Sequence, residues 1–285
     1  MVALAGCSTL LAASCGGGSA TDSPTPLMAT TTIWADIASQ VVCGEPVPSL
    51  IPAGADPHTF EPSLRDRSLL DSATVVIANG GGLEGSLVDL LDLAASNGTD
   101  VVEMMPLARP VSDDPHVWQD PTRVSEVVDE IAAAAITAGF DADDVTACAD
   151  DYRTELVALD TEIAGLLAPL PPESRRMVTS HDSLAYFADR YDLEIIGTVI
   201  PSTNTLAESN AADLAALATQ IETLRVPAVF TEELESSADA DRLANRLGVE
   251  VVPLVTDALT SDPATDTYVE MMKSNATTIA EALAP

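Results

Sequence analysis

Three histidines are the residues of this chain that point most directly to chemistry. They are the only histidines among 285 residues, and the first two each follow an Asp-Pro pair: His58, His116 and His181. Proline fixes its own φ angle and restricts the residue before it, so the histidine that follows leaves the chain in a limited range of directions. A side chain held in this way loses little conformational freedom when it binds a metal ion. We therefore predict that the three histidines bind one ion.

The residue types of this set favour zinc. Imidazole suits zinc, copper, nickel and iron, whereas sets rich in carboxylates suit manganese, calcium and magnesium. Three imidazoles and one carboxylate would form a closed tetrahedral zinc site. The alternative is that each histidine is an ordinary surface or core residue with a local hydrogen bond.

The charge of the chain excludes one class of partner. Twelve Lys and Arg stand against 45 Asp and Glu, which gives a net charge of −33, and Lys273 is the only lysine. Because nucleic-acid binding requires basic surface to neutralise phosphates, we expect no nucleic-acid partner. The acidic surface keeps the protein soluble; a field that gathers cations is a weaker interpretation, since salt screens it within ~10 Å. A hydrophobic content of 47% and this length allow two folded domains.

The first 26 residues are predicted to be a signal peptide followed by a flexible lipoprotein tether. Residues 1–14 are small and apolar, and Gly, Ser, Thr and Pro dominate residues 16–26. The apolar run is too short to span a bilayer. A cysteine at the cleavage site would carry the lipid. Cys7 fits the lipobox pattern more closely, but Cys15 follows the longer apolar run and directly precedes the tether, so we favour Cys15. The protein would then be extracytoplasmic and would touch the membrane only through its lipid.

The number of cysteines that remain after cleavage also fits an exported protein. Cleavage before Cys15 leaves Cys43 and Cys148 as the only other cysteines. Since exported proteins reach an oxidising compartment, where an even pair often bridges, we predict a Cys43–Cys148 disulfide. The alternative is two buried free thiols.

The elements that must position the histidines alternate between strand and helix. In the first block, strands are expected at residues 28–33, 47–51 and 74–78 and from residue 101, and helices at 34–43, 62–72, 83–95 and 121–138. Residues 141–167 contain an apolar series at helical spacing, which predicts one long helix of roughly 25 residues that prolines end at 169–172. The second block alternates again up to a last helix at 267–283. This pattern is typical of parallel sheets covered by helices.

The boundaries that follow are a tether at 1–26, an N-terminal metal-binding lobe at 27–140, a linking helix at 141–169 and a C-terminal metal-binding lobe at 170–285. The predicted fold class is α/β, with two lobes, each a mainly parallel sheet flanked by helices, joined by one long rigid helix. In open parallel sheets, ligands bind at the carboxyl ends of strands. His181, Glu232 and Asp257 each follow a predicted strand, so we expect them to face His58 and His116 across one cleft.

With these features assembled, the chain resembles the metal-ion substrate-binding lipoproteins of bacterial ABC importers, the zinc and manganese type that includes ZnuA, TroA and AztC. The resemblance extends from about residue 30 to residue 283. It is carried by five segments: residues 52–62, 114–118, 180–188, 230–232 and 256–259.

The resemblance implies a role and a ligand set. It implies a receptor, not an enzyme, that delivers a metal ion to an ABC permease and works as a monomer, with a metallochaperone as a possible further partner. It implies that His58, His116, His181 and Asp257 hold the ion. Relatives that prefer manganese commonly have a carboxylate at the position of His181, so three histidines favour Zn²⁺, with Mn²⁺ or iron(II) as alternatives.

Two further carboxylates are candidates to support the ligands. Metal-bound histidines usually donate their other ring N–H to a carboxylate or carbonyl, which makes Glu232 and Glu61 candidates. Glu232 could instead be one surface carboxylate among many, and Glu61 could cap the helix after it. A zinc hydrolase is the alternative from another class. It requires an open ligand position, and the chain contains neither a His-Glu-x-x-His nor a Gly-x-Ser-x-Gly motif.

Overall fold

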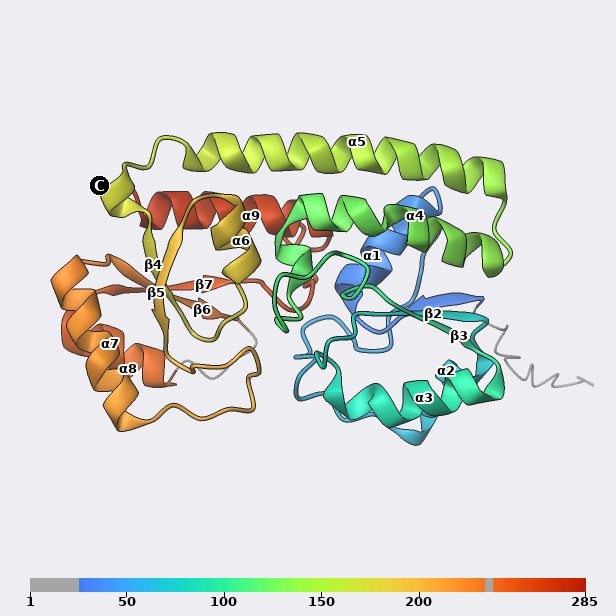
Figure 1. The fold of residues 1–285 in the computed structure, drawn as a ribbon, viewed down its shortest axis with the longest axis horizontal. Helices are drawn as coiled ribbons and strands as arrows, with labels where there is room; N and C mark the ends of the chain where they lie inside the picture. The colour runs from blue at the N-terminus through green and yellow to red at the C-terminus, as the bar shows by residue number, and fades with distance from the viewer. Residues whose placement is uncertain (1–25, 234–237) are drawn as a thin grey trace, which may run out of the picture.

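The structure, a computed structural model, describes residues 26–233 and 238–285. Two α/β lobes lie side by side, and one long helix runs along both of them (Figure 1). Each lobe is built on a parallel sheet flanked by helices, which confirms the fold class expected from the alternation of strands and helices. Among the described residues, no helix combines the length and apolar character needed to cross a membrane.

The N-terminal lobe has a three-stranded parallel sheet in the order β1 (Leu27–Ala29), β2 (Val75–Ala78), β3 (Asp100–Glu103). Successive side chains of a strand point to opposite faces of the sheet, so those of β1 and β2 enter two different cores. Met28, Val76 and Ala78 pack with α2 (Leu64–Ser72) and α3 (Val88–Asn97), which the short η1 (Gly85–Leu87) precedes. The other face packs with α1 (Thr32–Val41) and α4 (Pro121–Thr137).

Two predicted strands of this lobe differ from the structure. The strand expected at residues 28–33 ends at Ala29, because Thr31 caps α1: its hydroxyl accepts the N–H of Trp34 at 3.4 Å. The strand expected at residues 47–51 is reduced to a single bridge between Ser49 and Ala29. Prolines at 46, 48 and 52 remove the N–H donors that a longer ladder requires.

Helix α5 (Ala142–Leu167) is the long helix that the sequence predicts. Its 26 residues span roughly 39 Å at 1.5 Å per residue. Asp141 caps it by accepting the N–H groups of Asp143 and Asp144. Its buried face repeats at intervals of three and four residues and packs on α1, α4 and α9 (Tyr268–Ala282). That buried face consists of Val145, Ala149, Tyr152, Leu156, Leu159, Ile163 and Leu167.

The C-terminal lobe begins after η3 (Pro172–Ser174) and has a four-stranded parallel sheet. The strand order is β5 (Glu194–Thr198), β4 (Arg176–Thr179), β6 (Ala228–Glu232), β7 (Glu250–Leu254). Helices α7 (Ala211–Leu224) and α8 (Ala238–Leu247) cover one face. Helix α6 (Ala185–Arg190) and α9 pack on the other.

One hydrophobic core runs through both lobes. The same cluster of buried side chains includes Trp34 and Trp118 from the N-terminal lobe and Phe187 and Tyr268 from the C-terminal lobe. Because close-packed interiors resist deformation, a continuous core opposes wide opening of one lobe against the other.

The structure also pairs Cys43 with Cys148 in a disulfide, with 5.4 Å between the two Cα atoms. The bridge joins the end of α1 to the first turns of α5. The two cysteines proposed for lipidation, Cys7 and Cys15, lie outside the described residues.

Candidate metal centre

Four buried side chains converge between the lobes: His58, His116, His181 and Asp257. One potential ligand atom from each lies within 4.8 Å of the others. The Nε2 atoms of His58 and His116 are 3.4 Å apart. The carboxylate of Asp257 lies 3.6 Å from Nε2 of His58, 3.8 Å from that of His116 and 3.9 Å from that of His181. The structure therefore brings together all four residues of the expected ligand set, with three imidazole nitrogens facing one carboxylate.

The Asp-Pro-His settings have a local structural reason. In both, an aspartate oxygen accepts the backbone N–H of the histidine two residues later, at 2.8 Å for Asp56 and His58 and at 3.0 Å for Asp114 and His116. This closes an Asx turn, which an aspartate side chain forms with the backbone two residues on. The turn and the fixed φ of the proline together set the direction in which each histidine leaves the chain.

The two other ligand candidates, His181 and Asp257, and the supporting candidate Glu232 lie at or just after the ends of strands. His181 follows β4, Asp257 follows β7, and Glu232 is the last residue of β6. Because β4, β6 and β7 are parallel neighbours, their carboxyl ends meet at one edge of the sheet. His116 immediately precedes the short η2 (Val117–Gln119) in the opposite lobe.

Two of the histidines are oriented by buried carboxylates. Nδ1 of His116 lies 2.6 Å from Oδ1 of Asp114, and Nδ1 of His181 lies 2.9 Å from Oε1 of Glu232. A carboxylate accepts hydrogen bonds, so Nδ1 of each ring carries the hydrogen and Nε2 keeps its lone pair for an ion. This is the arrangement found around metal-bound histidines.

Glu232 is held as a carboxylate in spite of its burial. Burial by itself raises the pKa of a carboxyl group, but the neighbouring His181 ring and hydrogen bonds from His181 and Ser183 lower the pKa of Glu232 below its ordinary value. The Ser183 hydroxyl donates to Glu232 at 2.6 Å. Of the two carboxylates considered from the sequence, Glu232 is therefore the one that lies beside a histidine of the candidate site.

His58 is neutral at ordinary pH. Burial, with smaller contributions from His116 and His181, lowers the pKa of His58 to about 3. Its ring is therefore available as a ligand without first losing a proton. Its Nδ1 atom is buried and has no hydrogen-bond partner among the described residues, unlike the rings that face Asp114 and Glu232.

Buried hydrogen bonds tie the two lobes together at the site. The indole N–H of Trp118 donates to the carbonyl of Thr256 at 2.9 Å, which links the segment of His116 to the residue before Asp257. The Tyr186 hydroxyl donates to the carbonyl of Asp114 at 3.1 Å. The relative positions of His116, His181 and Asp257 are therefore fixed by contacts that cross the cleft.

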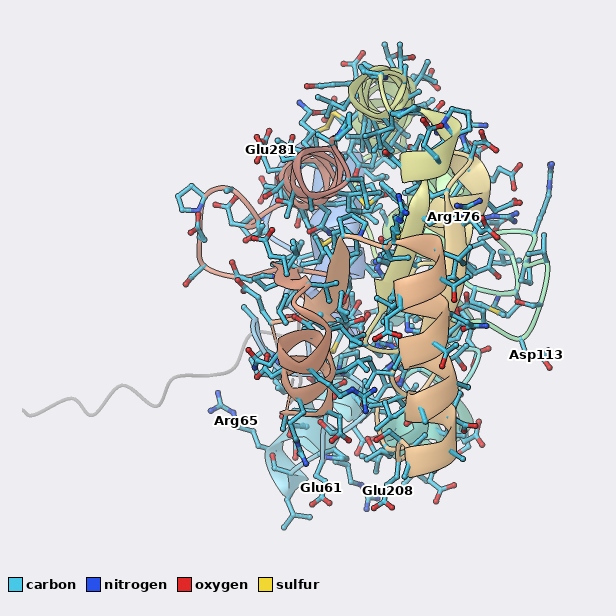
Figure 2. All side chains as sticks on the ribbon, turned by 90° about the vertical axis from the view of Figure 1, so that its left-hand side faces the viewer. Glu61, Arg65, Asp113, Arg176, Glu208 and Glu281 are labelled. Atoms are coloured by element: carbon cyan, nitrogen blue, oxygen red, sulfur yellow. A yellow bond between two sulfur atoms is a disulfide. The ribbon has the colours of Figure 1, made fainter. Side chains whose placement is uncertain are left out.

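Glu61 does not support the ligand nearest to it in the chain, because Nδ1 of His58 has no hydrogen-bond partner among the described residues. It is exposed and lies at the end of the molecule farthest from α5 (Figure 2). It does not cap α2 either: Ser63 and Asp66 form a capping box there. Glu61 therefore has neither of the two roles considered from the sequence.

Some supporting residues had no role in the sequence analysis, although a signal was present. Asp114 stands in the same motif as His116, and an aspartate two residues before a histidine is suited to an Asx turn. Trp118 lies two residues after His116 in the same motif, and it makes the hydrogen bond between lobes. No sequence pattern points to Ser183.

Comparison with known proteins identifies the family. The family model of ZnuA, the periplasmic component A of zinc-uptake complexes, matches residues 27–282. The chain belongs to this family. Its members are substrate-binding proteins of metal ABC importers, which work with a permease, and they are not enzymes.

Relatives in this family are named for two metals. The manganese-binding lipoprotein MntA of Halalkalibacterium halodurans is 29% identical over 96% of this chain and 95% of its own length. The zinc-binding protein TroA of Treponema pallidum is 29% identical over 91% of this chain and 89% of its own length. The solved structure of periplasmic TroA superposes with a TM-score of 0.83 and 27% identity, covering 91% of this chain and 99% of that one.

Changing Glu232 to Gln tests its support of His181. The amide keeps the size of the side chain but lacks the charge that holds Nδ1–H of His181, so we expect metal affinity to fall about 10- to 100-fold. Chelator competition measures the affinity. Glu233→Gln is the matched control, because Glu233 is the exposed neighbour of Glu232 in the chain. Equal affinities for the two variants would remove Glu232 from the site.

Proposed function

We propose that this protein captures zinc outside the cytoplasmic membrane and delivers it to an ABC permease. Membership of the family supports metal binding and the importer. The observation that supports zinc as the bound metal is the donor set: three imidazoles, each with Nε2 near Asp257. Zinc accepts such a tetrahedral set of nitrogen and oxygen ligands. In this proposal His58 and His116 supply the ligands from one lobe, and His181 and Asp257 supply them from the other.

Manganese is the second candidate for this site, and iron(II) is the third. The names of relatives favour manganese: two lipoproteins 29% and 30% identical to this chain are named manganese-binding. Against this, manganese prefers sites dominated by carboxylate and water oxygens. A hydrolytic zinc site is not supported, because a fourth protein ligand would close the position that a reacting water needs.

Delivery would rely on local movements. The core that runs through both lobes and the buried contacts of Trp118 and Tyr186 oppose wide opening. The ion would therefore leave through shifts of the loops that carry ligands. We further propose that lipidation of Cys15, or of Cys7, anchors the protein to the membrane, as relatives named lipoproteins suggest. A metallochaperone could supply the ion.

Competition between the two metals tests this function. Purified metal-free protein is offered equal concentrations of zinc and manganese, and the metal retained after desalting is measured. We expect one equivalent of zinc to be retained, with no stoichiometric manganese. Preferential retention of manganese would reject the zinc assignment and favour a site governed by carboxylates. Absence of stoichiometric metal would reject the proposed function.

A further inference from the structure

A hydrogen bond between the lobes lies directly beside His58. The Thr205 hydroxyl donates to Oδ2 of Asp56 at 2.9 Å, across 149 positions of sequence. The other oxygen of the same carboxylate accepts the backbone N–H of His58 at 2.8 Å. Asp56 therefore connects Thr205 of the C-terminal lobe to the turn that directs His58.

The segment that carries Thr205 is itself fastened to both neighbours of His181. The N–H of Ile200 donates to the carbonyl of Ser180 at 2.7 Å, and the N–H of Asp182 donates to the carbonyl of Ser202 at 2.9 Å. This segment, residues 200–206, lies between β5 and α7 and extends toward the N-terminal lobe on the side away from α5 (Figure 1). The Thr205–Asp56 bond thus links the loop of His181 to the loop of His58.

The position of His58 depends on the Thr205–Asp56 bond more than the positions of His116 and His181 do. The rings of His116 and His181 are oriented by Asp114 and Glu232. The ring of His58 has no such partner at Nδ1 among the described residues. Its position is therefore set through its backbone, and the Asp56 carboxylate is the side chain that holds that backbone.

We propose that Thr205 is a positioning residue that slows the departure of the ion. Its hydrogen bond to Asp56, called the latch below, holds the loop of residues 52–60 against the C-terminal lobe at the metal site. The proposal rests on the proposed function. When the Thr205–Asp56 bond opens, the loop can withdraw His58 and leave the ion with His116, His181 and Asp257, which buried contacts hold in place. A backbone bond from Gly54 to the carbonyl of Leu259, at 3.2 Å, also joins the loop to the C-terminal lobe. That bond needs no side chain, so the contribution of Thr205 can be tested separately.

Thr205→Val is the variant that tests the latch, because it removes the hydroxyl and keeps the shape. The protein is loaded with zinc and mixed with an excess of a chromophoric chelator in a stopped-flow instrument. We expect zinc to dissociate about 10-fold faster than from the wild type, which corresponds to one hydrogen bond to a carboxylate. Thr205→Ser retains the hydroxyl and should restore the slow rate.

Thr203→Val is the matched control, since Thr203 is half-buried in the same segment, two residues away. It should leave the dissociation rate unchanged, and the melting temperatures of the metal-free variants should agree with that of the wild type. An unchanged rate in Thr205→Val, or an equal acceleration in Thr203→Val or Thr205→Ser, would overturn the latch and leave the proposed function intact. A wild-type protein that binds no zinc would overturn both.

Discussion

Replacement of His181 by Ala is expected to weaken zinc binding by more than ~100-fold, beyond the usual cost of losing a residue that only supports a ligand. The reason is geometric: His181 supplies one of the three imidazole nitrogens that face Asp257, and no other histidine is available in the chain to replace it. Competition with chelators of graded affinity measures the change.

The alanine variant has a second consequence that must be separated from the first. It leaves the buried Glu232 carboxylate without the ring of His181, and an uncompensated buried charge destabilises a fold strongly. His181→Gln keeps an N–H donor of similar size but no imidazole, so it isolates the loss of the ligand. Both variants should lose affinity. Wild-type affinity in folded His181→Gln would exclude His181 from the site.

Removal of the disulfide should produce the largest change in stability. The bridge closes a loop with a sequence separation of 105 residues, and a loop of about 100 residues corresponds to ~4.7 kcal/mol in the chain-entropy description, within a usual range of about 2–5. We therefore expect the Cys43→Ser/Cys148→Ser variant to be less stable by about 4 kcal/mol. Denaturant unfolding of metal-free protein measures this difference.

The same variant should bind zinc as the wild type does, because the bridge joins α1 to α5 and not to the loops that carry ligands. The matched comparison is wild-type protein unfolded with and without a reductant, which should reproduce the loss of stability. If the oxidised wild type and the double variant unfolded at the same denaturant concentration, the bridge would have no stabilising role.

The sequence predicts best those features that depend on local patterns. Strand β2 lies at Val75–Ala78, within the predicted residues 74–78, because a short run of apolar residues forms it. The long helix α5 differs by one residue at its start, since Asp141 is its cap. Convergence of His181, Glu232 and Asp257 follows from a general property of parallel sheets, which does not depend on side-chain detail.

Features that depend on tertiary contacts could not be predicted in this way. A run of β-branched residues at 30–33 resembles a strand, and only the hydroxyl of Thr31 turns it into the start of a helix. The bonds from Trp118 to Thr256 and from Thr205 to Asp56 join residues more than a hundred positions apart, and no periodicity records them. Glu61 and Glu232 were equal candidates in sequence, and only the fold buries one and exposes the other.

The measurement that tests the account most directly is X-ray diffraction from crystals of the zinc-loaded protein, recorded on both sides of the zinc absorption edge. We predict one anomalous peak between the lobes, at about 2.0–2.2 Å from Nε2 of His58, His116 and His181 and from an oxygen of Asp257. A peak bound by other residues, or one that lacks any of these four ligands, would contradict the proposed site.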